Sequence, residues 1–226
     1  MNDQTNRRKR QHIEVIGRDE GVERNGRFFD AMSLQHRAMP EINLADVDPS
    51  IEIMGKRLSF PLLISSMTGG DDVLVEKVNQ RLAQAAQITG VAMGVGSQRV
   101  MLEDKKAAAS FDLRKYAPDA LLFANIGAIQ LNNGMGPDQL QKAIDVLAAD
   151  AIFLHLNPLQ EAVQPEGDTN FANLAQAIGH AQANLNVPVV LKEVGAGLSV
   201  ADIELGMRHG IKWFDVAGRG GTSWAR

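Results

Sequence analysis

The sequence predicts an α/β protein of the TIM (β/α)8 barrel class, and two observations carry that prediction. Short apolar segments alternate with amphipathic ones at roughly 30 residues per unit, the spacing of parallel strands joined by crossover helices. Polar residues also follow nearly every apolar segment. A doubly wound open sheet shares the alternation, but repeated polar strand ends favour a barrel, whose mouth collects one group from each strand.

Six strands are predicted from short runs of apolar residues. They are residues 61–65, 91–96, 121–126, 151–156, 187–193 and 213–216. Their nearly continuous apolar character indicates burial on both faces, as in a parallel sheet covered by helices. Because a closed barrel has eight strands, we expect residues 56–226 to form an incomplete barrel with about six of the eight present.

Helices are predicted between the strands from apolar residues at helical spacing. Their buried faces are expected at Leu74, Val78, Leu82 and Ala85, at Leu140, Ile144 and Leu147, and at Leu174, Ile178, Ala181 and Leu185. A further polar, helix-forming stretch covers residues 103–115. Pro137 suits the first position of a helix, and Ser199 with Asp202 forms a capping box.

Residues 1–55 lack a clear alternating pattern and are expected to form an N-terminal arm and a lid over one end of the barrel. The arm contains a basic cluster, Arg7 to Arg10, with His12 close behind it. Such a cluster is commonly a solvated tail. Alternatively, Arg8, Lys9 and His12 form an anion clamp that neutralises a phosphate or diphosphate at the mouth of the site.

Composition excludes several classes of function. The chain has 226 residues, 45% of them hydrophobic, and no long apolar run, so we expect a large core and no membrane span. It has no cysteine, which excludes thiol catalysis and disulfides and agrees with a cytoplasmic location. The mild net charge of -4 argues against a nucleic-acid partner. The polar, basic start of the chain is not a secretory signal.

The most polar strand end is that of residues 151–156, where Pro158 stops the strand and His155, Asn157 and Glu161 share one loop. Loops at the carboxyl ends of barrel strands carry the active site, so these residues are candidates for chemistry. The alternative is that His155 and Asn157 only cap the strand and that Glu161 faces water. The other polar strand ends are Ser66–Gly70, Ser97–Arg99, Asn125, Lys192–Glu193 and Gly218–Ser223.

Lys192 lies within an apolar strand, where an ammonium group either loses its proton or finds an anion. A reduced flavin, which is anionic at its N1 and C2 carbonyl edge, is one such partner. The alternative is an ion pair with a neighbouring carboxylate such as Glu193 or Asp215.

Seven blocks, in order along the chain, resemble the type 2 isopentenyl-diphosphate delta-isomerase family. They are Arg8–Lys9 with His12, Met67–Gly70, Ser97–Arg99, His155–Glu161, Gln164–Asp168, Lys192–Glu193 with Gly195, and Gly218–Trp224. The resemblance implies an FMN-dependent barrel enzyme of isoprenoid biosynthesis that requires Mg2+ and a reduced flavin, with NADPH as the usual reductant. It further implies interconversion of isopentenyl and dimethylallyl diphosphate, and a homo-oligomer, either a tetramer or an octamer.

Carried over position by position, the resemblance implies the site residues. The implied FMN ligands are Ser66, Met67, Thr68, Ser97, Asn125, Lys192 and Thr222. The implied substrate ligands, mostly for the diphosphate, are Arg8, Lys9, His12, Ser97, Gln98, Arg99, His155 and Gln160. Glu161 is the implied Mg2+ ligand, and a hard cation that bridges diphosphate oxygens needs few protein ligands.

Gln160, His155 and Lys192 are the expected catalytic residues. Moving the double bond requires a proton at one carbon and loss of a proton from another, with no net redox change. No ordinary side chain in the seven blocks is acidic enough to protonate an alkene easily, so reduced flavin is the better candidate. Gln160 is too weak a base to act alone and is expected to orient the substrate or relay a proton. Lys192 would keep the reduced flavin anionic.

Two other functions stay open. Another FMN-dependent barrel oxidoreductase, such as a 2-hydroxy acid oxidase or an ene reductase, would share the role of Lys192 but leaves the basic cluster and Glu161 unexplained. A non-catalytic barrel fragment that binds a phosphorylated ligand or a partner subunit is the second. In such barrels the cofactor phosphate sits after strands seven and eight, so a chain that stopped at Arg226 would bind FMN poorly.

Overall fold

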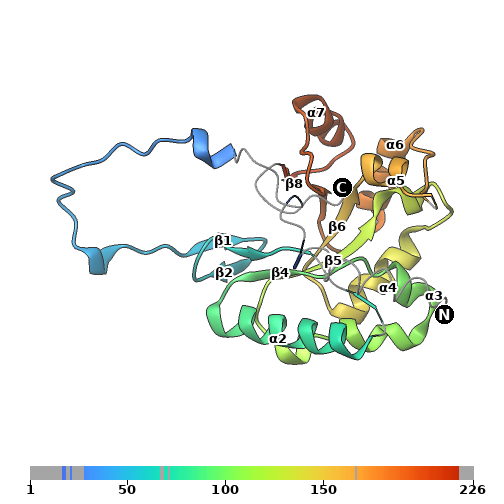
Figure 1. The fold of residues 1–226 in the computed structure, drawn as a ribbon, viewed down its shortest axis with the longest axis horizontal. Helices are drawn as coiled ribbons and strands as arrows, with labels where there is room; N and C mark the ends of the chain where they lie inside the picture. The colour runs from blue at the N-terminus through green and yellow to red at the C-terminus, as the bar shows by residue number, and fades with distance from the viewer. Residues whose placement is uncertain are drawn as a thin grey trace.

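A computed structural model describes residues 17–18, 21, 28–66, 69–70, 72–165 and 167–218. Six parallel strands form one curled sheet in chain order (Figure 1). The strands are β3 (Leu63–Ile64), β4 (Ala92–Gly94), β5 (Leu122–Gly127), β6 (Ala151–Leu156), β7 (Val189–Glu193) and β8 (Trp213–Asp215). Parallel pairing of sequential strands is the (β/α)8 barrel arrangement. The six predicted strands are confirmed, although β3 and β4 are shorter than predicted.

Four longer helices cover the outer face of the sheet. They are α2 (Val73–Thr89), α4 (Pro137–Leu147), α6 (Leu174–Asn184) and α7 (Val200–Arg208). The outward side chains of the strands, such as Ala124, Ile152 and Leu191, share one buried apolar cluster with residues of α2, α4 and α6. The predicted faces of α4 and α6 are confirmed, because Ile144 of α4 and Ile178 of α6 belong to that cluster.

The predicted buried face of α2 was wrong by one residue. Its buried positions are Val75, Asn79, Ala83 and Ala86, whereas Leu74 is 53% exposed. The two alanines bring the helix close to the sheet, and the buried amide of Asn79 donates to the carbonyl of Ser110 at 3.0 Å. The pattern of large apolar residues therefore predicted the wrong face of α2, because small residues and a hydrogen-bonded amide form the contact between this helix and its neighbours.

The stretch predicted as a helix over 103–115 is mostly not α-helical. The short helix α3 (Arg99–Glu103) is followed by two 3-10 helices, η4 (Lys105–Phe111) and η5 (Arg114–Tyr116). A 3-10 turn tightens the chain, and here it buries Ala107, Phe111 and Leu113 completely. The segment therefore acts as a packed connection between α3 and β5.

The inner face of the sheet carries a second apolar cluster at the end where the strands begin. Phe123 of β5 and Phe153 of β6 stack with ring centroids 4.6 Å apart, and Val190 of β7 packs in the same cluster. The antiparallel hairpin β1 (Ile51–Ile53) and β2 (Lys56–Leu58) adds Leu58 to it. The domain boundary that we predicted at residue 55 therefore falls within a hairpin that packs against the barrel.

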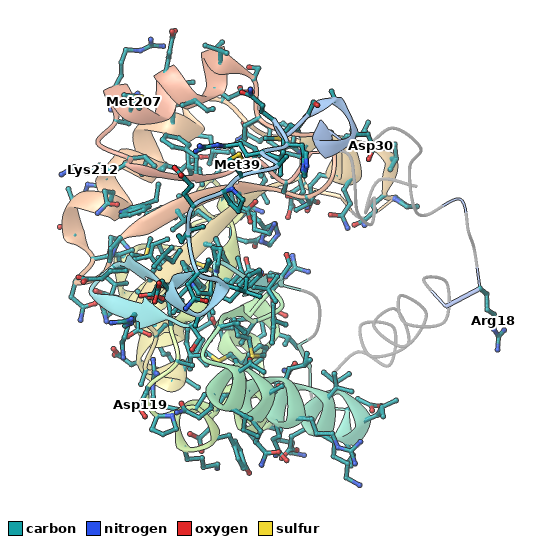
Figure 2. All side chains as sticks on the ribbon, turned by 90° about the vertical axis from the view of Figure 1, so that its left-hand side faces the viewer. Arg18, Asp30, Met39, Asp119, Met207 and Lys212 are labelled. Atoms are coloured by element: carbon teal, nitrogen blue, oxygen red, sulfur yellow. The ribbon has the colours of Figure 1, made fainter. Side chains whose placement is uncertain are left out.

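Residues 28–50 project from the hairpin as a long segment with two short 3-10 turns, η2 (Phe28–Ala31) and η3 (Leu44–Asp46) (Figure 1). Figure 2 faces this segment, which runs from Asp30 past Met39. Several of its large apolar side chains are exposed, Leu34 by 90% and Leu44 by 85%. Among the described residues, no helix combines the length and apolar character that a membrane crossing requires.

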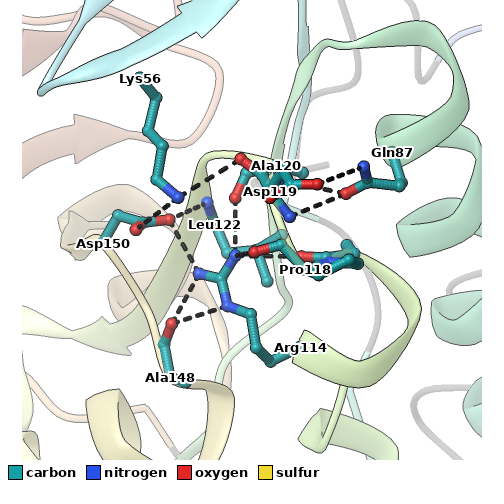
Figure 3. Close-up of polar contacts among 10 residues, drawn as sticks. Lys56, Gln87, Arg114, Pro118, Asp119, Ala120, Leu122, Ala148 and Asp150 are labelled. Atoms are coloured by element: carbon teal, nitrogen blue, oxygen red, sulfur yellow. Dashed lines mark hydrogen bonds and ion pairs between the residues drawn. The ribbon is translucent and has the colours of Figure 1, made fainter.

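Arg114 fastens the connections at the end of the sheet where the strands begin (Figure 3). Its Nη1 donates to the carbonyls of Ala117 and Ala120, and its Nη2 donates to the carbonyl of Ala148 at 2.6 Å. Nη2 also lies 2.8 Å from Oδ2 of Asp150. One guanidinium therefore joins the segment before β5 to the turn between α4 and β6, a geometry that only the planar fork of arginine satisfies.

We expect Arg114→Leu to lower the free energy of unfolding by about 3 kcal/mol, because it leaves a carboxylate and several carbonyls without their donor. Arg114→Lys should recover only part of the loss. Urea unfolding followed by circular dichroism measures both. Lys115→Ala is the control, since that neighbouring lysine is exposed and contacts only Asp112, as an ion pair, and the ring of Tyr116, 5.3 Å away. Its unfolding midpoint should lie close to that of the unmodified chain. An equal effect of the two truncations would contradict the role of Arg114.

Candidate active site

Strand register brings three polar side chains into one row on the inner face. His155 of β6 pairs with Lys192 of β7, and Lys192 pairs with Asp215 of β8. Successive side chains of a strand point to opposite faces, so these residues face the same side as Phe153 and Val190, two positions earlier. The row therefore lies one layer above the apolar inner cluster, toward the carboxyl ends of the strands.

Lys192 is buried, with 7% of its surface exposed, and its Nζ donates to Oδ2 of Asp215 at 2.9 Å. The ammonium also lies 5.9 Å from the centroid of the Phe153 ring. Of the partners that we considered for this lysine, the structure provides the carboxylate of Asp215. Glu193 faces the other way, and its Oε2 accepts hydrogen bonds from the backbone N–H groups of residues 195–197.

His155 is held in a defined orientation by Asn125 of β5. The Nδ2 group of Asn125 donates to the carbonyl of Val95 at 2.9 Å, so its Oδ1 faces Nδ1 of His155, 2.8 Å away. This arrangement places the imidazole hydrogen on Nδ1 and leaves Nε2 as an acceptor. Gly127 provides the space beside the ring, because a Cβ there would lie 3.1 Å from Nε2.

The pKa of His155 is lowered to about 4, first by burial and then by the positive charges of Lys192 and Arg99. The imidazole is therefore neutral at pH 7 and acts at Nε2 as an acceptor of a hydrogen bond or a proton. Among the groups of the row, the positive charge belongs to Lys192.

The loop after β6 turns directly into the short helix α5 (Pro158–Val163), which carries Gln160 and Glu161. The buried amide of Asn157 donates to Oε1 of Gln160 at 3.1 Å and to Oε1 of Glu161 at 2.7 Å. The other oxygen of Glu161 accepts from the backbone N–H of Asp168 at 2.8 Å. Both oxygens are thus oriented, and a carboxylate with four lone-pair sites keeps capacity for a cation.

Among the described residues, Glu161 is not part of a protein-only metal cluster. In the part of the chain that the structure describes, no group of three or more His, Cys, Asp or Glu residues gathers at a possible metal position. Mg2+ commonly binds one or two protein carboxylates and takes its other ligands from water and substrate phosphates. Glu161 fits that kind of site and does not fit a fully protein-ligated one.

Of the residues after β4, Arg99 lies at the mouth and Gln98 does not. Arg99 is partly exposed and forms long ion pairs with Glu103 at 3.7 Å and Asp168 at 3.9 Å. Gln98 is fully buried, its Nε2 donating to the carbonyl of Ala143 and its Oε1 accepting from the backbone N–H of Asn125. The amide of Gln98 is therefore engaged, and the structure gives no support to the prediction that this side chain binds substrate.

The inner face also holds a polar atom without a partner, which bears on whether a cofactor fits. Oγ of Ser66, which follows β3, is buried and has no hydrogen-bond partner among the described residues. A Cβ at Gly94 would lie 2.6 Å from this hydroxyl and 2.8 Å from the Phe153 ring. A ligand with hydrogen-bonding groups at this position would satisfy the hydroxyl, and the edge of a flavin has such groups.

Some predicted site residues lie outside the described part of the chain. They are Arg8, Lys9, His12, Met67, Thr68 and Thr222. The structure brings together the described ones that line β5 to β7 and the loop after β6: Asn125, His155, Gln160, Glu161 and Lys192. Ser97 is half-buried at the start of the loop that carries Arg99.

A sequence model for the family described as FMN-dependent dehydrogenase matches residues 6–118, half of the chain. This chain belongs to the FMN-dependent dehydrogenase family. Solved structures in the same fold include a mandelate oxidase mutant with a monooxide FMN adduct, at TM-score 0.52 and 19% identity over 76% of this chain and 51% of that one. A flavocytochrome b2 mutant matches at TM-score 0.53 and 14% identity, over 76% of this chain and 45% of that one.

The chain is also similar to proteins named isopentenyl-diphosphate delta-isomerase. It is 56% identical to the one from Hydrogenovibrio crunogenus over 97% of this chain and 64% of the relative. The identity is 54% with the one from Paracoccus zeaxanthinifaciens, over 97% of this chain and 63% of that protein. The identity is 48% with the protein from Nostoc sp., over 99% of this chain and 64% of that protein. The chain thus spans a little under two thirds of the length of these relatives.

The sequence indicated Asn157 only as a candidate for chemistry or a strand cap, and it indicated no role for Asp168 or Gly127. Asn157 and Asp168 belonged to distinctive polar blocks, but nothing in a block says which amide or N–H orients which side chain. Gly127 follows Asn125 by two residues on the same strand, and this spacing places both on the inner face beside His155. This two-residue spacing could have identified Gly127 from the sequence.

The low pKa of His155 predicts a pH dependence of stability. Between pH 6.5 and about 4 the unfolded chain binds a proton at this position that the folded chain does not bind, so stability falls as the pH falls through this window. We expect the free energy of unfolding, measured in urea, to drop from pH 7 to pH 5 by about 1 to 2 kcal/mol more in the unmodified chain than in His155→Gln. An equal drop in both would contradict the neutral state of this imidazole in the folded chain.

Proposed function

We propose that this protein interconverts isopentenyl diphosphate and dimethylallyl diphosphate, using reduced FMN, in isoprenoid biosynthesis. The observation that carries the proposal is 56% identity over 97% of the chain to a protein named isopentenyl-diphosphate delta-isomerase. The site supports this function because its polar groups form two separate sets. A buried lysine and a neutral histidine face the inside of the sheet, whereas a carboxylate and an arginine lie in the loops above.

The residues proposed to hold FMN are Ser66, Asn125 and Lys192, together with Ser97, Met67, Thr68 and Thr222. When bound and reduced, the flavin supplies a proton-exchanging N5 and an electron-rich ring that stabilises positive charge on the substrate. Lys192 contributes an ammonium group whose charge Asp215 already balances. An anionic flavin edge near Nζ would share that ammonium with Asp215 and be stabilised in its anionic form.

The residues proposed to bind the diphosphate are Arg99, Ser97 and His155, with Arg8, Lys9 and His12 of the arm. Arg99 supplies charge, because its ion pairs are long and partly solvated and therefore exchange readily for phosphate oxygens. His155 is neutral, so we propose that its Nε2 accepts a hydrogen bond or a proton and does not act as a fixed cation. Gln98 is left out of the proposal, because its side chain and its backbone N–H are both hydrogen-bonded within the fold.

Gln160 and Glu161 are proposed to act side by side. Glu161 would bind Mg2+ that also coordinates the diphosphate, and Gln160 would orient the isoprene carbons or relay a proton. Asn157 bonds to both side chains and keeps them on the same side of α5. The metal and the hydrocarbon therefore have separate, adjacent contacts.

Other parts of the proposal rest on the family resemblance and on composition. We propose NADPH as the reductant, a tetramer or octamer as the assembly, residues 1–55 as an arm and lid, and a cytoplasmic location consistent with the absence of cysteine.

A second candidate is oxidation of a 2-hydroxy acid, because the matched structures include a mandelate oxidase. The two candidates differ in what the flavin does. Oxidation of a hydroxy acid reduces the flavin and needs no metal, whereas isomerisation begins with reduced flavin and ends with it. Flavin bleaching by mandelate or lactate under anaerobic conditions would favour the oxidase.

The direct test follows deuterium from heavy water into isopentenyl diphosphate with FMN, Mg2+ and dithionite present. We expect incorporation that stops when the flavin is reoxidised or the metal is removed by a chelator. Nuclear magnetic resonance of the substrate carbons measures it. A flavin-loaded protein that incorporates no deuterium would refute the proposed function.

Glu161→Gln should raise the Mg2+ concentration needed for half-maximal rate by about 10- to 100-fold, because the amide keeps the shape but loses the charge that binds a hard cation. Glu204→Gln is the matched control, since that glutamate is exposed on α7. Equal Mg2+ dependence of the two variants would exclude Glu161 as the metal ligand.

A further inference from the structure

We propose that Asp168 is a positioning residue that holds the guanidinium of Arg99 over the same mouth as the carboxylate of Glu161. This inference rests on the proposed function, because it concerns how the diphosphate and its Mg2+ are bound. It assigns the task to a side chain that contacts neither the flavin nor the isoprene in our proposal.

Asp168 contacts both of the charged residues concerned. Its backbone N–H donates to Oε2 of Glu161 at 2.8 Å. Its own Oδ2 lies 3.9 Å from Nη1 of Arg99 and accepts a hydrogen bond from Nε2 of Gln130 at 3.1 Å. Arg99 comes from the segment after β4, Gln130 from the turn η6 (Ala128–Leu131) after β5, and Asp168 from the loop after β6. One residue thus joins three successive loops at the mouth.

The position of Asp168 is fixed by contacts that do not involve Arg99. Nδ2 of Asn132 donates to the carbonyls of Asn170 and Ala172, at 2.7 and 3.0 Å, and so ties the segment beyond Asp168 to the loop after β5. Gly167 lies so close to Glu161 that any Cβ there would overlap its backbone carbonyl. The carboxylate of Asp168 is therefore placed by the fold and can in turn orient a flexible arginine.

Arg99 has a competing partner on its own helix. Oε1 of Glu103, one turn along α3, lies 3.7 Å from its Nε. Glu103 therefore holds the side chain along α3, whereas Asp168 draws its tip toward the loop of Glu161. Without the charge of Asp168, we expect the guanidinium to stay beside Glu103 and to meet the diphosphate less often.

This geometry lets an experiment distinguish positioning of Arg99 by Asp168 from simple repulsion between Asp168 and a bound anion. Asp168→Asn and Glu103→Gln remove the same charge at nearly the same distance from Arg99. If these carboxylates acted only by repelling an anion, both changes would tighten its binding. If Asp168 positions Arg99, Asp168→Asn weakens binding and Glu103→Gln does not.

The experiment measures binding of inorganic pyrophosphate with Mg2+ to the FMN-loaded protein by isothermal titration calorimetry. We expect Asp168→Asn to raise the dissociation constant by about 2- to 5-fold, the range that one exposed ion pair supports, and Glu103→Gln to leave it unchanged or lower it. Gln130→Leu should weaken binding in the same direction, since it frees the carboxylate of Asp168 without changing any charge. In an Arg99→Met background, Asp168→Asn should no longer weaken binding.

Equal shifts for Asp168→Asn and Glu103→Gln, or the same weakening by Asp168→Asn in the Arg99→Met background, would overturn the inference. So would failure of the unmodified protein to bind pyrophosphate. Thermal melting identifies a variant that does not fold, in which case Gln130→Leu decides the question. Since calorimetry does not require turnover, a protein that binds pyrophosphate as described but incorporates no deuterium would refute the isomerase function and leave this inference standing.

Discussion

The ion pair between Lys192 and Asp215 is the interaction on which the rest of the site depends. Strand register places an ammonium group inside a curled sheet, directly above stacked phenylalanine rings, where an unpaired charge would be costly. Asp215, from the next strand, supplies the counter-charge at 2.9 Å and thereby holds the lysine side chain inside the sheet. The same register sets His155 beside Lys192, and that nearby positive charge, added to burial, keeps the imidazole neutral.

The polarity of the inner face increases in layers from the start of the strands to their ends. Phe123, Phe153 and Val190 form an apolar floor, and the row of His155, Lys192 and Asp215 lies above it. The loops beyond carry partly solvated charges at the mouth. A planar, partly anionic ring suits the row, and a highly charged phosphate group suits the mouth. This gradient is the physical reason why one face can take both the flavin and the diphosphate that we propose.

The fold could be predicted from the sequence wherever large apolar residues carry the pattern, as at Ile144 of α4 and in β5 to β7. The prediction was wrong for α2, where Ala83 and Ala86 make the contact. That Asn125, His155 and Lys192 share one face could be predicted, because side chains two residues apart on a strand point to the same side. The roles of Asn157 and Gln98 could not be predicted. A buried amide can hydrogen-bond to a ligand or to the protein itself, and its neighbours in space determine which. Here Asn157 orients Gln160 and Glu161, whereas Gln98 holds the backbone of Asn125.

The row on the inner face is tested most directly by the pKa of His155 in the variant Lys192→Met with Asp215→Asn, measured by nuclear magnetic resonance of the imidazole. This pair of changes removes the buried ammonium without leaving its carboxylate unpaired. The pKa should rise from about 4 and stay below 6.5, because burial, the larger cause of the shift, is unchanged. Lys212→Met, at an exposed position before β8, should leave it unaltered. An unchanged pKa in the double variant would contradict the placement of Lys192 beside His155.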